Sequence, residues 1–67
     1  MPNCKIKVKN LYLEDFFLTS EGEMILVEFN CDNYYVFESG EQAQKMKDII
    51  VEELAIPENE INIYMVE

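Results

Sequence analysis

The sequence contains no histidine, arginine or tryptophan, and it has only two glycines, two prolines and two cysteines. Histidine is the usual general base near neutral pH, so its absence removes the commonest catalytic partner for Ser20, Ser39 or a cysteine. A glycine-rich phosphate-binding loop is excluded because Gly22 and Gly40 are far apart. We therefore expect a protein that is not an enzyme and has no catalytic residues.

Metal and cofactor sites are also poorly supported. Two cysteines without histidine fall short of the four ligands of a usual structural zinc site, and the spacing of an EF-hand calcium loop is missing. We expect no cofactor and no metal. Cys4 and Cys31 are interpreted as small, half-buried strand residues that stay reduced inside a cell, with a disulfide as the alternative.

Long apolar runs are absent as well. No stretch of about 18 apolar residues could span a membrane, and Met1 to Lys5 lacks the apolar core of a signal peptide. The expected location is the cytoplasm of the cell that makes the protein. The hydrophobic content of 49% is too high for a disordered acidic tail. Residues 1–67 are therefore expected to form a single acidic domain.

What the chain does have is negative charge. Fourteen Asp and Glu stand against five Lys, which gives a formal net charge of −9. Lys5, Lys7 and Lys9 are grouped near the start, whereas the stretch from Glu14 to Glu41 carries many acids and no base. This stretch overlaps predicted strands, so its carboxylates should be held in fixed positions.

The hydrophobic pattern predicts an α+β fold. Strict alternation over residues 4–9 is typical of a half-buried strand, and lysines on its outer face suit an edge strand. Ser39 and Gln42 form a capping-box pattern at the start of a helix that ends near Leu54. Strands are expected over residues 4–9, 11–19, 24–31, 34–38 and 61–66. The predicted architecture is an antiparallel β-meander with one helix, in the order β-β-β-α-β, and a first strand split in two is an open alternative.

The two faces of one predicted hairpin raise a question about burial. A two-residue turn at Asp32 and Asn33 would place Cys31 opposite Tyr34 and Phe29 opposite Val36. Both faces of this hairpin would then be apolar, although a single helix can cover only one of them. Two alternatives stay open: the chain folds over the second face as a small barrel, or that face is an interface. The second face would consist of Met24, Leu26, Tyr35 and Phe37.

The charge distribution also favours one class of partner. Acidic surfaces repel phosphate backbones, so we expect no direct binding to nucleic acid, and three lysines on an edge strand are more typical of edge protection. A fixed set of carboxylates is instead attracted to the basic groove of a nucleic-acid-binding protein. In size, acidity and expected strand order the chain resembles the small inhibitors that phages and bacteria direct at nucleic-acid enzymes. These include anti-CRISPR proteins, restriction inhibitors, uracil-DNA glycosylase inhibitors and nuclease immunity proteins, which share no motif.

The leading hypothesis is therefore a non-enzymatic acidic protein that docks on a basic, nucleic-acid-processing protein and blocks it as a nucleic-acid mimic. Aromatic side chains beside the acids would act as anchors. The candidate partner-binding residues are Glu14, Asp15, Glu21, Glu23, Glu28, Asp32, Tyr35, Phe37 and Glu38. A second set of acids comprises Glu52, Glu53, Glu58 and Glu60. The alternative hypothesis is an accessory module that self-associates, as a homodimer, through the Met24, Leu26, Tyr35 and Phe37 face.

Overall fold

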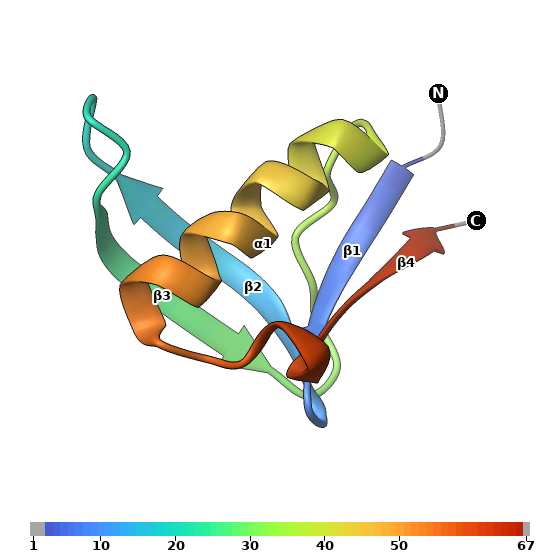
Figure 1. The fold of residues 1–67 in the computed structure, drawn as a ribbon. Helices are drawn as coiled ribbons and strands as arrows, with labels where there is room; N and C mark the ends of the chain where they lie inside the picture. Colours follow the sequence, from blue (N-terminus) through green and yellow to red (C-terminus); the bar gives the residue numbers. More distant parts are fainter. Residues whose placement is uncertain (1–2, 67) are drawn as a thin grey trace.

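The α+β class predicted from the sequence is confirmed by the structure, a computed structural model that describes residues 3–66 (Figure 1). Four antiparallel strands form one sheet in the order β3-β2-β1-β4, with a single helix packed on it. Met1 and Pro2, used above to argue against a signal peptide, and the terminal acid Glu67 lie outside the described residues. The elements are β1 (Asn3–Val8), β2 (Leu11–Leu18), β3 (Met24–Asn30), α1 (Gly40–Leu54), the 3-10 turn η1 (Glu58–Glu60) and β4 (Ile61–Val66).

The first predicted strand is indeed split, because β1 and β2 form a tight hairpin. Val8 pairs with Leu11, and Lys9 and Asn10 make the turn between them. On its other side β1 pairs with β4 along its whole length, from Asn3 opposite Val66 to Val8 opposite Ile61. The interpretation of β1 as an edge strand is therefore wrong. Alternation of lysine with apolar residues shows only that one face of the strand is exposed to solvent. A central strand also has such a face when a helix covers the sheet on one side only.

Two irregularities shape the β2–β3 pair. The apolar residues Leu13 and Phe16 are three positions apart, and a register shift between Leu13 and Asp15 brings both to the core side. A second shift lies near Ile25, because Phe17 pairs with Leu26 whereas Leu18 pairs with Met24. The extra residue reverses the alternation, so that Met24 packs on the core and Leu26, 47% exposed, does not.

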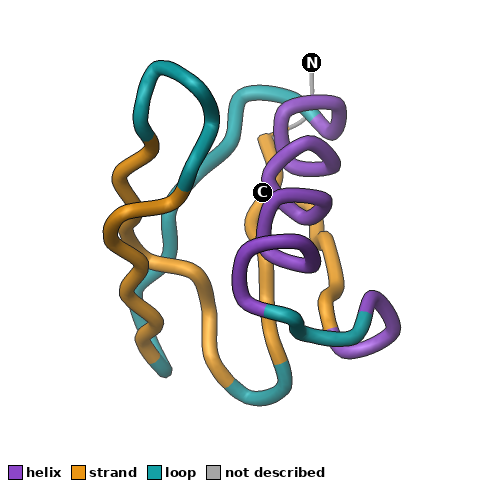
Figure 2. Tube along the Cα trace, turned by 60° about the vertical axis from the view of Figure 1, so that its left-hand side comes forward, coloured by secondary structure: helices purple, strands orange, loops and turns teal. Residues whose placement is uncertain are grey.

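The predicted strand over residues 34–38 is wrong, and so is its pairing with the preceding strand. After Asn30 the chain turns, because the Asn30 side-chain oxygen accepts hydrogen bonds from the amides of Asp32 and Asn33, both at 2.8 Å. Residues 31–39 then cross to the start of α1, through the space where β1 and β2 diverge (Figure 2).

Backbone hydrogen bonds fix the crossing segment in that space. The Tyr35 amide donates to the Leu13 carbonyl at 2.8 Å, and Phe37 exchanges two bonds with Cys4, at 2.8 and 2.7 Å. The crossing segment thus bonds to Leu13 and Cys4 and not to the open edge of β3, which pairs with β2 on its other side. The strand order is linear with edges at β3 and β4, so among residues 3–66 the sheet is open and does not close into a barrel.

The helix begins and ends as local chemistry requires. Ser39 is the N-cap, and its hydroxyl accepts a hydrogen bond from the Gln42 amide at 3.2 Å. The return bond of the expected capping box comes from the Glu38 amide rather than from that of Ser39. Ala43, Met46 and Ile50 form the buried stripe of α1, which packs against β1 and β4 (Figures 1 and 2). The predicted helix is confirmed.

The hydrophobic core lies between α1 and the inner side of the sheet. Its fully buried large side chains come from β1, β2, α1 and β4: Ile6, Leu13, Ile50 and Ile61. Cys4 also lies in this core, whereas Cys31 is exposed just beyond β3, and no disulfide joins the two within the described chain. Neither cysteine is the half-buried residue that we expected from the pattern.

Candidate protein-binding surface

The outer side of the β2–β3 pair carries two distinctive cross-strand pairs. Asp15 lies directly opposite Glu28, and Phe17 lies directly opposite Leu26. Opposed residues in an antiparallel ladder project from the same face, and so do residues two apart in a regular strand. We call this set of four residues, Asp15, Phe17, Leu26 and Glu28, the hairpin face. All four side chains are exposed, Phe17 at 60%.

The hairpin face is costly for folding. Like charges directly opposite in a ladder destabilise the pair, and an exposed phenylalanine gains little from burial. No cation compensates the two carboxylates, because the one ion pair among residues 3–66 joins Lys9 to Glu60. A basic partner would relieve the repulsion and bury the apolar pair at the same time, which is the usual composition of a binding surface.

The turn beside the hairpin face holds two further acids. Thr19 organises it, because its hydroxyl accepts from the amides of Glu21 and Glu23, at 3.3 and 3.0 Å. The Thr19 amide also donates to the Glu23 carbonyl at 2.8 Å, and Gly22 adopts a positive φ of 88°. The backbone of both glutamates is therefore fixed, although the sequence pattern did not identify Thr19 as the residue that does this.

The remaining predicted acids are not gathered with these. Glu14 is half-buried beside Asp15, Asp32 lies beyond the end of β3, and Glu38 lies in the crossing segment just before the N-cap of α1. The seven residues of β3 extend roughly 20 Å, so Asp32 is at the opposite end of the strand from Glu23. Of the predicted acids, the structure brings Asp15 and Glu28 together as a directly opposed pair.

The two predicted aromatic anchors differ in exposure. Phe37 is 4% exposed in the core, so its ring is not presented to a partner, whereas Tyr35 is 40% exposed. The Tyr35 ring packs edge-on against Phe16 and Phe37, with centroids 4.8 Å away in each case. The face predicted from Met24, Leu26, Tyr35 and Phe37 does not exist as one surface, since Met24 and Phe37 belong to the core side.

Sequence reasoning missed Phe17 as a candidate anchor. Its position follows from the bulge that aligns Leu13 with Phe16, which turns the next residue outward. The signal was the three-residue spacing of these apolar residues, interrupted by Glu14 and Asp15.

The other half of the outer sheet surface carries lysine and tyrosine. The Lys5 ammonium lies over two rings, 4.8 Å from the centroid of Tyr12 and 4.5 Å from that of Tyr34. Lys7 lies over Tyr12 at 5.3 Å. These contacts are typical of cation–π pairs, and they place the ammonium groups of both β1 lysines beside tyrosine rings. The outer surface is thus divided into a lysine–tyrosine half and an acidic–apolar half.

Two acids of the second predicted set have partners inside the molecule. A Glu53 carboxylate oxygen accepts from the Met24 amide at 3.1 Å and so connects α1 to the start of β3. The Glu60 carboxylate lies 3.5 Å from the Lys9 ammonium. Within the described part of the chain, no group of three or more acidic or cysteine side chains could hold a metal ion. No helix there is long and apolar enough to cross a membrane.

The chain matches no protein-family model, no curated protein and no solved structure. The hairpin face is therefore identified by its geometry and charge.

Proposed function

We propose that this protein is a non-enzymatic binding protein that docks its hairpin face on a basic partner protein. The partner class that best complements fixed carboxylates is a nucleic-acid-processing enzyme, whose basic groove would be blocked by occlusion. The proposal places the protein in the cytoplasm, that of the host cell if a phage encodes it. It involves no cofactor and no direct contact with nucleic acid.

One observation carries the proposal. Asp15 and Glu28 are held opposite each other with no ion-pair partner among residues 3–66, next to the exposed pair of Phe17 and Leu26. Partner arginines or lysines would make charge-assisted hydrogen bonds to the carboxylates, and the apolar pair would supply the desolvated anchor. Glu21 and Glu23, fixed by Thr19, extend the negative field at one end of this surface.

The test is capture of partners from the native host's lysate, including the effectors of its mobile elements. We expect the wild-type chain to retain a basic nucleic-acid-binding protein at low salt and to release it at high salt. The double variant Asp15→Asn/Glu28→Gln should bind the captured protein about tenfold more weakly. The control Glu52→Gln/Glu58→Gln makes the same change in net charge at exposed sites on α1 and η1 and should bind normally.

Equal losses in both double variants would show that only net charge matters and would contradict a defined docking face. A partner retained equally at low and high salt would contradict the electrostatic mechanism.

Self-association remains the second candidate, because Phe17 and Leu26 are exposed and adjacent across the ladder. A two-fold dimer through this face would bring the carboxylates of both copies together, which disfavours it. Light scattering decides the matter: a tight dimer that Leu26→Glu dissociates would support self-association, and a stable monomer would exclude the homodimer.

A further inference from the structure

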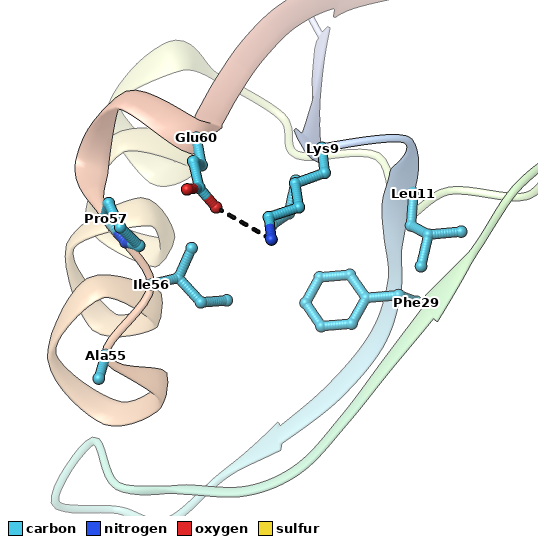
Figure 3. Close-up of a pocket in the computed structure, with 8 residues that line it drawn as sticks. Lys9, Leu11, Phe29, Ala55, Ile56, Pro57 and Glu60 are labelled. Carbon is cyan, nitrogen blue, oxygen red and sulfur yellow. Dashed lines mark ion pairs between the residues drawn. The ribbon is translucent and has the colours of Figure 1, made fainter.

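An apolar pocket of about 410 Å³ lies on the core side of the sheet, at the end of the molecule where the β1–β2 turn meets the connection from α1 to η1 (Figure 3). Its walls include Val8, Leu11, Phe29 and Ile56. Its polar groups are the side chains of Lys9 and Glu60, which form the ion pair described above. The volume falls in the range of about 300–1,000 Å³ that is usual for ligand pockets.

Two unusual backbone conformations lie at this pocket. Lys9 and Ala55, with φ values of 56° and 55°, are the non-glycine residues in the left-handed region among residues 3–66, and both line it. Ala55 is the C-cap of α1, where the left-handed conformation is common, and Lys9 lies in the tight β1–β2 turn. At Lys9 the conformation is held by a hydrogen bond from its amide to the Glu60 carbonyl at 3.2 Å.

The two charged side chains are not equally free to move. Lys9 is 71% exposed and Glu60 is 37% exposed in their side chains. Lys9 extends across the pocket between Glu60 and the apolar walls (Figure 3). Since it is the more exposed member of the pair, it can move away and leave the carboxylate beside an apolar pocket. The Glu60 carboxylate beside these apolar walls suits a group with an aliphatic stem that ends in a cation.

We infer that this pocket receives an arginine or lysine side chain of the basic partner, which displaces Lys9 and pairs with Glu60. The inference rests on the proposed function and names a second contact of the same complex. Charge complementarity supports it, because the chain carries a net charge of −9 that favours cations over anions. The apolar walls would bury the methylene stem of the incoming side chain, as long basic side chains commonly allow.

The test uses the isolated 67-residue chain and three small probes of similar length: butylguanidine, 1-pentanol and pentanoate. Amide chemical shifts in two-dimensional NMR spectra report binding at each residue. We expect butylguanidine to shift the signals of Leu11, Phe29 and Ile56, pentanol to bind more weakly, and pentanoate not to bind.

Two variants are expected to change the affinity for butylguanidine in opposite directions. Glu60→Gln keeps the backbone carbonyl and should weaken butylguanidine binding about fivefold, because it removes the charged acceptor. Lys9→Met keeps the stem without the competing charge and should tighten binding about twofold. A merely structural disturbance of the pocket would weaken binding in both variants, and if Glu60→Gln fails to fold, Lys9→Met still decides.

Tighter binding of pentanoate than of butylguanidine would overturn the inference, as would weaker butylguanidine binding in Lys9→Met or the absence of shifts at the pocket. The titration needs no partner, so its failure would leave a partner captured through Asp15 and Glu28 unaffected. Failure of the capture experiment would likewise leave the titration result readable.

Discussion

The two glycines show how differently one residue type can act in this chain. Gly22 needs its positive φ of 88° to close the β2–β3 turn, whereas Gly40 has no positive φ and begins α1. A Cβ atom would meet nothing within 4 Å at either position, so the backbone alone decides the outcome. A substitution at each glycine therefore separates conformational strain from steric contact.

We predict that Gly22→Ala lowers the free energy of unfolding by about 1 kcal/mol through strain in the left-handed region. Gly40→Ala should raise it by about 0.5 kcal/mol, since alanine restricts the unfolded chain and favours the helix. Urea denaturation of the two variants measures both effects. Destabilisation by Gly40→Ala would show that the start of α1 requires glycine for a reason other than its conformation.

Thr19 stabilises the β2–β3 turn through its side chain. Its hydroxyl accepts from two amides of the β2–β3 turn, and valine has the same shape without the oxygen. We predict that Thr19→Val lowers the free energy of unfolding by about 1 kcal/mol. It should also broaden the amide signals of Glu21 and Glu23 in NMR spectra. Unchanged signals would mean that the two backbone bonds from Thr19 to Glu23 and from Gly22 to Thr19 suffice to hold the turn.

At the scale of the element, the β2–β3 hairpin exposes an acidic–apolar face in which two carboxylates lie directly opposite each other. Glu28→Gln removes the repulsion with Asp15 but keeps the shape of the side chain. We predict that the variant is more stable than wild type by about 0.5 kcal/mol, although it binds the captured partner more weakly. Thermal unfolding measures the change in stability, and titration with the partner measures the change in affinity. Loss of stability would show that Glu28 has a structural role.

The elements that were predicted correctly are those whose sequence patterns lie within the element itself. Ser39, Gln42 and the buried stripe of Ala43, Met46 and Ile50 lie within one helix, so its start, end and inner face could be predicted. Alternation likewise predicted β1, although not its central place, because its partner β4 lies at the other end of the chain.

The crossing segment could not be predicted in the same way. Aspartate and asparagine at 32 and 33 are typical of a hairpin turn, but the segment after them bonds to Leu13 and Cys4 and leaves the outer edge of β3 open within residues 3–66. Phe37 instead lies in the core, where its backbone exchanges two hydrogen bonds with that of Cys4. The candidate site could not be predicted for a related reason. Asp15 lies opposite Glu28 only because of a bulge, and a bulge changes the strand register by one residue.

At the scale of the whole molecule, fourteen acids and five lysines make electrostatic repulsion a general property of the fold. One ion pair, between Lys9 and Glu60, is formed in the described part of the chain. We predict that the melting temperature rises as NaCl is increased from about 20 to 300 mM, because screening reduces the repulsion. Differential scanning calorimetry measures this shift. A melting temperature that falls with salt would show that favourable charge contacts dominate.

The full-length pairing of β1 with β4 has a consequence for the connectivity of the chain. Asn3 lies opposite Val66, so the two ends of the described chain are neighbours at one end of the sheet. A short linker could therefore join them and make the chain circular. New ends could then be opened at the exposed residues 31–33 without interrupting a strand or the helix. Permuted in this way, the crossing segment would become the first part of the chain and β3 the last, with the same neighbours in space.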